Sequence, residues 1–159
     1  MGHHSPGILL LHALTVGDCC SFSNGYNERV TLSGEHDLKT LLRNMNPSLS
    51  REEFVFCSVD DAHHLPALAI YREAEGTTLI MERSEADRRR MKSVFPCRRI
   101  TLNVHSSLDA VGFLSVVVQE LSAASISTNV VSAYYHDHLF VASQDAERAL
   151  AILKAMAAN

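Results

Sequence analysis

The feature that most constrains the fold is a strand pattern that leads directly into a helix pattern in the second half of the chain. Across residues 99–105, apolar side chains alternate with polar ones, which is typical of a half-buried strand. The next apolar residues recur at helical spacing, at Val111, Leu114, Val118 and Leu121. This repeat predicts a helix that ends near Ala124 and packs one face against the strand.

The remainder of this half predicts two further strands and a last helix. Residues 128–135 are rich in β-branched and aromatic side chains, and a second strand at 138–142 follows a turn at His136-Asp137. The last helix carries an apolar stripe made of Ala146, Ala149, Leu150, Leu153 and Met156. The expected order is therefore β-α-β-β-α.

The first half predicts a related set of elements. A helix begins near Glu35 and ends at Asn46-Pro47, with an apolar stripe at Leu38, Leu41, Leu42 and Met45. Three strands are expected at residues 53–59, 67–72 and 77–82, followed by a short polar helix over residues 84–92. The order in this half is α-β-β-β-α.

Both halves favour an α+β fold of tandem ferredoxin-like units, of the βαββαβ type, with antiparallel sheets and helices on one face. We expect the two domains at residues 30–96 and 97–159. Each half is short of one edge strand. Either the halves complete each other's sheets by strand exchange, or residues 1–29 supply the missing strand.

Composition narrows the class of protein. A net charge of −4 argues against a dedicated nucleic-acid binder, and no apolar run is long enough to cross a membrane. No Lys or Arg precedes the apolar run at residues 8–16, so it does not fit an export signal, and a cytoplasmic protein with reduced cysteines is expected. Residues 1–29 show no helical period. We interpret them as an N-terminal extension, either disordered or an artefact of the assigned gene start.

Several stretches resemble the ACT domain family. Residues 98–112, RRITLNVHSSLDAVG, are similar to the strand, loop and helix start of an ACT domain. Residues 129–141, NVVSAYYHDHLFV, resemble a group of uncharacterised bacterial proteins with two ACT-like domains. The segments that fit the first domain of that group are residues 38–42, 54–59 and 71–79.

The resemblance implies a regulatory protein. ACT domains, as in aspartate kinases and other enzymes of amino-acid biosynthesis, bind amino acids or similar metabolites at interfaces between paired domains. For this chain the resemblance implies a small-molecule ligand, a homo-oligomer, no cofactor and no catalytic activity. The ligand-contacting places are the loop between the first strand and the first helix, and the start of the second strand.

These two places correspond to a predicted ligand-binding set made of Ser106, Ser107, Leu108, Asp109, Ala110, Gly112, Asn129 and Val130. Ser107 is expected to cap the long helix, whose unpaired N–H groups suit a carboxylate. Gly112 permits a close approach of ligand or backbone, and the amide of Asn129 can hold both an amino and a carboxyl group. Each has a structural alternative: Ser107 only caps the helix, Gly112 only packs against the sheet, and Asn129 is a turn or strand-edge asparagine.

Other clusters are given structural interpretations. His136-Asp137-His138 offers two imidazoles and a carboxylate, but no further ligand follows at a supportive spacing, so we expect a hairpin turn and no metal site. The basic run Arg88-Arg89-Arg90 is interpreted as a solvated helix face. The sequence contains no nucleophile elbow, P-loop or zinc-protease motif, so no catalytic residue is predicted.

Together with the resemblance, the sequence predicts an ACT-type regulatory protein. We expect it to bind a small molecule of the amino-acid class and to catalyse no reaction. The alternative is a structural or protein-interaction module that has no ligand and docks on a partner enzyme.

Overall fold

The computed structural model describes residues 34–60, 62 and 64–158. Residues 1–29, interpreted above as an extension, lie outside this described part. The elements in chain order are α1 (Leu38–Asn44), β1 (Ser48–Val59), β2 (Ala69–Glu73), β3 (Gly76–Glu82), α2 (Arg83–Arg88), β4 (Val94–Leu102), α3 (Phe113–Ala123), β5 (Thr128–Ser132), β6 (Asp137–Ala142), the 3-10 turn η1 (Ser143–Asp145) and α4 (Ala146–Ala157).

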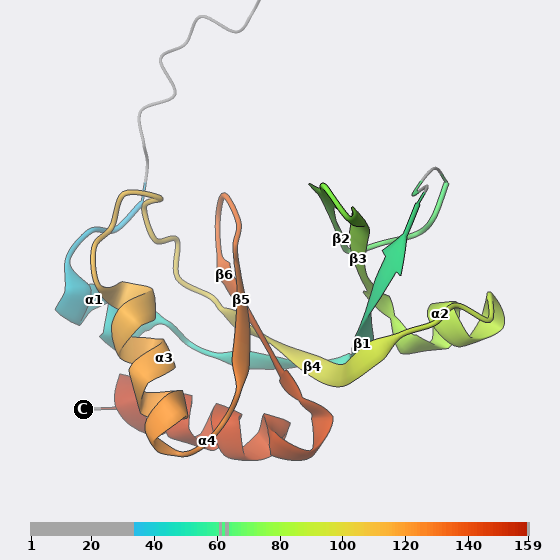
Figure 1. Cartoon of the computed structure of the whole chain (residues 1–159). Coiled ribbons are helices and arrows are strands. Elements are labelled where there is room, and N and C mark those ends of the chain that lie inside the picture. The colour runs from blue at the N-terminus through green and yellow to red at the C-terminus, as the bar shows by residue number, and fades with distance from the viewer. Residues whose placement is uncertain (1–33, 61, 63, 159) are drawn as a thin grey trace, which may run out of the picture. The chain divides into compact units, whose positions relative to one another are not determined.

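The six strands form one antiparallel sheet in the order β2-β3-β1-β4-β6-β5. The sheet curls, so that the β2–β3 and β5–β6 hairpins rise on the side away from the helices (Figure 1). This arrangement confirms the predicted α+β class, the antiparallel sheet and the placement of helices on one face.

Alternation along the strands separates two faces of the sheet. The helix face carries Val55, Ile100 and Leu139, and helices α1, α3 and α4 bury their apolar stripes there against β4 and β6. Helix α2 packs its Ala86 on the same face, against β1 and β3. The opposite face, which we call the open face because no described helix covers it, carries a cluster of Phe54, Ile80, Cys97 and Phe140. Cross-strand pairing of Phe54 with Cys97 places these two side chains on that one face.

The missing edge strands are supplied by strand exchange within the described unit. The second half of β1, Phe54 to Val59, pairs with β3, whereas the first residues of β1, Ser48 and Leu49, pair with the end of β4. The start of β4 likewise pairs with β1, and its later residues pair with β6. Each ferredoxin-like unit therefore has four strands because it shares β1 and β4 with the other. The predicted boundary between residues 96 and 97 falls inside β4, and the division into two domains there stays a prediction.

Two central strands are longer than their sequence patterns predicted. β1 begins at Ser48 rather than residue 53, and β4 begins at Val94 rather than residue 99, so that it includes the Phe95-Pro96 pair. Proline cannot donate to a ladder and is found inside sheets only at bulges or edges. Here the β1–β4 register shifts between Phe54 and Phe56, opposite this pair, and Phe95 has a φ of 56°. The irregular backbone thus accommodates Pro96 in a central strand.

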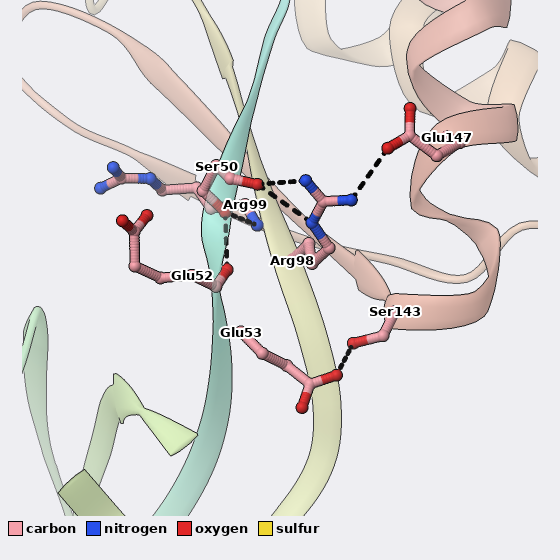
Figure 2. A network of polar contacts seen from close by, with 7 residues as sticks. All are labelled: Ser50, Glu52, Glu53, Arg98, Arg99, Ser143 and Glu147. Carbon is pink, nitrogen blue, oxygen red and sulfur yellow. Dashed lines mark hydrogen bonds and ion pairs between the residues drawn. The ribbon is translucent and has the colours of Figure 1, made fainter. Parts of the chain in front are cut away.

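A second register shift, between Leu49 and Glu53, marks the place where β1 passes from one unit to the other. Polar groups replace the ladder bonds there (Figure 2). Arg98 donates its Nε to the carbonyl oxygen of Ser50 at 3.0 Å and its Nη1 to Glu147 of α4 at 2.9 Å. The Ser50 hydroxyl accepts from the backbone N–H of Arg99 at 3.1 Å. These bonds satisfy the backbone where the ladder is interrupted.

Glu53 joins three elements at this place. Its carboxylate accepts from the hydroxyl of Ser143 in η1 and from the guanidinium of Arg83 in α2, the latter at 2.7 Å. The hydrogen bond from Ser143, followed by that from Arg83, holds the pKa of Glu53 below its ordinary value of 4.5. A carboxyl group whose pKa is lower in the folded state stabilises the fold fully at any pH above its unfolded-state pKa. This stabilisation is lost as the pH falls through the folded-state pKa.

We therefore expect Glu53→Gln to lower the free energy of unfolding by about 1 kcal/mol at pH 7. Urea unfolding between pH 7 and pH 3 should show the difference from wild type shrinking below pH 4.5. Glu147→Gln is the control. The Glu147 side chain is exposed where it pairs with Arg98, so this substitution should lower the free energy of unfolding by less than about 0.5 kcal/mol. A pH-independent loss in the Glu53 variant would contradict this role of its charge.

No helix in the described part of the chain is long and apolar enough to span a membrane.

Candidate ligand-binding site

The loop between β4 and α3 is held by the segment that precedes α1. Glu35 forms an isolated parallel bridge with Ser106, in which the Glu35 N–H donates to the His105 carbonyl at 2.9 Å and the Ser107 N–H donates to the Glu35 carbonyl at 3.0 Å. Gly34, with a φ of 137°, lies so close that an added Cβ would stand 2.6 Å from the Ser107 nitrogen. Glycine is thus required for this approach of two backbones.

Helix α3 begins later than its sequence pattern predicted. Ser107 was expected as the N-cap, but the helix starts at Phe113 and its N-cap residue is Gly112, with a φ of 93°. The N–H groups of Phe113, Leu114 and Ser115 precede the first intrahelical bond, which the Val116 N–H donates to the Gly112 carbonyl. No side chain caps them, and no acidic residue lies in the first turn. The reason for the difference is that Ser107 is used elsewhere: its N–H bonds to Glu35 and its hydroxyl to Asp109.

Asp137, the first residue of β6, is a buried carboxylate beside this helix start. Its side chain is 2% exposed and accepts hydrogen bonds from the hydroxyls of Ser106, at 2.9 Å, and Ser132. Among the described residues it forms no ion pair with a cation. A buried charge is costly without compensation, so this carboxylate is suited to a cationic group of a ligand.

The helix start and Asp137 line the same small cavity, of about 130 Å³. It is lined by Ser106, Ser107, Leu108, Ala110, Gly112, Phe113, Leu114, Ser115, Ser132 and Asp137. The cavity therefore combines unpaired N–H donors with a buried carboxylate that has no cationic partner among the described residues, an arrangement that can hold opposite charges of one molecule.

The structure brings together five of the eight predicted site residues, and three lie outside the cavity. Asp109 is in the same loop, where its carboxylate contacts His36 at 3.2 Å. Asn129 is exposed on β5 and pairs with Phe140, which places its side chain toward the open face, whereas Asp137 is on the helix face. Val130 points to the helix face, two residues from Ser132, and is 37% exposed. The binding roles of all eight stay predictions.

Sequence reasoning missed the two polar residues that the sheet adds, Asp137 and Ser132. Asp137 was interpreted as a turn former, but the turn lies before it and Asp137 pairs with Ser132 inside the ladder. A signal was present in the sequence. Asp137 has the same parity as Leu139 and Val141, which are fully buried, so a carboxylate was to be expected on the apolar face of that strand.

The histidines near this turn have separate partners. His136 Nδ1 lies 3.3 Å from the Val104 carbonyl, and His138 Nδ1 lies 3.0 Å from the Thr101 hydroxyl. Burial, and then the charge of Arg99, lowers the pKa of His138. In the part of the chain that the structure describes, no three His, Cys, Asp or Glu side chains gather as a metal site would require.

Comparison with known proteins agrees with this fold. The ACT domain family matches residues 33–98 and, separately, residues 94–155. A crystal structure of a Vibrio cholerae protein of unknown function is 39% identical, has a TM-score of 0.69, and covers 76% of this chain and 95% of its own. No curated protein matches the chain at a significant level.

More distant structures show the fold alone. An Agrobacterium tumefaciens protein is 21% identical with a TM-score of 0.55, over 66% of this chain and 81% of its own. The regulatory subunit of aspartate kinase from Thermus thermophilus is 6% identical with a TM-score of 0.55, over 69% and 95% respectively. The fold and its repeats define a tandem ACT-domain protein. This chain belongs to the ACT domain family, whose members are regulatory rather than catalytic modules.

Proposed function

We propose that this chain is an ACT-type regulatory protein that binds a small amino acid and catalyses no reaction of its own. The observation that carries the proposal is the joint lining of one cavity by the unpaired N–H groups of α3 and the buried carboxylate of Asp137. The match of both halves to a regulatory family supports the same function.

The chemistry of an α-amino acid fits this pair of groups. Its carboxylate would accept from the N–H groups of Phe113, Leu114 and Ser115, where the helix dipole favours negative charge. Its ammonium group would donate to Asp137, whose carboxylate has two acceptor positions left after the bonds from Ser106 and Ser132. Each end of the ligand thus meets a group of opposite charge.

The size of the cavity selects the ligand. At about 130 Å³ the cavity is small for a ligand site, so a small amino acid such as glycine, alanine or serine is expected. Exclusion of larger side chains would come from Leu108 and Leu114, which line the same space.

A homo-oligomer is part of this proposal. β5 is an edge strand of the sheet, and an unpaired edge is a ready partner for another strand. Apolar side chains are exposed around the α3 loop and β5, including Val111 at 86% and Leu108 at 55%. A second copy that packs there would bring its own residues, among them Asn129 and Val130, toward the ligand loop. The same exposed side chains support the alternative of an interaction module that docks on a partner enzyme.

We expect glycine, alanine or serine to stabilise the protein by about 2.7 kcal/mol when present at 100 times its Kd. A thermal-shift screen should detect this as a rise of several degrees in Tm. Asp137→Asn should abolish the rise, because it removes the charge that faces the ammonium group. Glu120→Gln is the matched control, since Glu120 is an exposed carboxylate of α3 that does not line the cavity.

Asn129→Ala should weaken binding if a second copy completes the site, and should leave the stability of the unliganded protein nearly unchanged. If no amino acid raises the Tm of the wild type, the interaction-module alternative is favoured.

A further inference from the structure

A second and larger cavity, of about 510 Å³, opens on the opposite side of the sheet from the α3 site. Its floor is formed by Phe54 and Arg99, and Ala67 and Leu68 form an apolar wall. The carboxylates of Glu52 and Glu82 lie at its exposed edge. The volume lies within the range of roughly 300–1,000 Å³ that small-molecule sites occupy.

Arg99 has no anionic partner among the described residues. Its neighbour Arg98 points to the helix face, where Ser50 and Glu147 satisfy it, whereas Arg99 points to the other side of the strand with Glu52 (Figure 2). The guanidinium carbon of Arg99 lies 5.5 Å from the centre of the Phe54 ring, and its buried Nε has no hydrogen-bond partner. The ring is 4% exposed, so the cation rests on an apolar floor. A guanidinium in such a place is suited to a planar carboxylate.

The positive charge of Arg99 acts on its surroundings. The pKa of His138, which occupies the same face of the neighbouring strand, is lowered by burial and then by Arg99. Asp137, on the other face of β6, acts in the opposite direction. Arg99 and Asp137 thus act on the pKa of His138 from opposite faces of the sheet and in opposite directions.

The carboxylates at the edge of the cavity select against simple anions. Glu85 is engaged by Arg88 and Arg89, but Glu52 and Glu82 form no ion pair among the described residues. Two unpaired negative charges in front of one positive charge repel a dicarboxylate or a phosphate. They attract a ligand that carries one carboxylate and two cationic groups.

We propose that this open-face cavity binds a basic amino acid. The α-carboxylate would pair with Arg99, and the α-ammonium and side-chain cation would pair with Glu52 and Glu82. The alkyl chain would lie on the wall formed by Ala67 and Leu68. One ligand of net charge +1 therefore balances the three unpaired charges that face the cavity. This site is separate from the one at α3 and takes a different class of amino acid.

The experiment is calorimetric titration of the full chain with L-lysine, L-norleucine and cadaverine. Norleucine lacks the side-chain cation and cadaverine lacks the carboxylate. Lysine should bind one per chain, and both analogues should bind at least about ten-fold more weakly. Arg99→Met, which keeps an unbranched stem over Phe54, should weaken lysine binding by at least about ten-fold. The double variant Glu52→Gln/Glu82→Gln should reduce the preference for lysine over norleucine.

Asp137→Asn is the control, because it removes the α3 site and should leave lysine binding unchanged. Failure of the wild type to bind lysine overturns the proposal, as does equal affinity in wild type and Arg99→Met. If Arg99→Met does not fold, the double variant Glu52→Gln/Glu82→Gln tests the proposal instead, because Glu52 and Glu82 are exposed and their substitution should not disturb the fold. An unchanged preference for lysine over norleucine in this double variant would overturn the proposal. Glycine binding with no lysine binding would leave the α3 proposal intact.

Discussion

Gly34→Ala is expected to destabilise the fold by about 2–4 kcal/mol, measured as the free energy of unfolding in urea. The φ of 137° is unfavourable for any residue with a Cβ, and the new Cβ would stand 2.6 Å from the Ser107 nitrogen and 2.8 Å from its Cα. Both contacts are with backbone, which cannot move aside as a side-chain end can. Since the displaced backbone is that of the ligand loop, the variant should also lose its response to small amino acids.

Gly112→Ala is the matched control for this prediction. Its φ of 93° is also unfavourable for alanine, but an added Cβ would meet only the end of the Leu38 side chain, at 3.8 Å. Gly112→Ala therefore strains the backbone but makes no overlap with neighbouring atoms, and it should lower the free energy of unfolding by about 1–2 kcal/mol. Equal losses in the two variants would show that the contact between Gly34 and Ser107 does not restrict the fold.

Phe140→Ala should destabilise the protein by about 3–5 kcal/mol, the usual cost of removing a buried aromatic side chain. Phe140 is 1% exposed, and its ring packs edge-on against Phe54 and Phe56, each at a centroid distance of 5.9 Å. Phe140 belongs to β6 and both partners belong to β1, so the contact joins the two ferredoxin-like units across the open face. The unfolding transition should stay single, because the units share strands.

Tyr135→Ala serves as the control for Phe140. Its ring contacts His105 and Tyr134, but it is 61% exposed, so its loss should cost less than about 1 kcal/mol. A loss below 1 kcal/mol for Phe140→Ala, or two separate unfolding transitions, would contradict the shared core.

Much of the fold could be predicted from local apolar periodicity. The stripe at Ala146, Ala149 and Leu153 predicted α4, and all three side chains are fully buried. The ends of β1 and β4 could not be predicted in the same way. Ser48 and Pro96 belong to strands because a partner strand lies beside them, and their side chains carry no period-2 signal. Strand exchange depends on such long-range pairing, so the sequence left both sources of the missing edge strand open.

The candidate site was predicted in part. The loop residues followed from the resemblance and from the expectation of a helix start nearby, and Ser106, Ser107 and Gly112 do line the cavity. The helix start itself was misplaced, because Ser107 is bound by Glu35, a residue distant in sequence. Asp137 was missed since its role depends on the register between β5 and β6. Long-range pairing decides both points, and the local alternation indicated only that Asp137 lies on the apolar face of its strand.

The central claim is that a small amino acid binds with its carboxylate at the start of α3 and its ammonium group at Asp137. A crystal structure grown with whichever of glycine, alanine or serine gives the largest thermal shift tests this claim most directly. We expect ligand density in the cavity of Ser106, Gly112 and Asp137, with one carboxylate oxygen within hydrogen-bond distance of the Phe113 to Ser115 N–H groups. Density for the ligand at another place, with this cavity filled only by water, would contradict it.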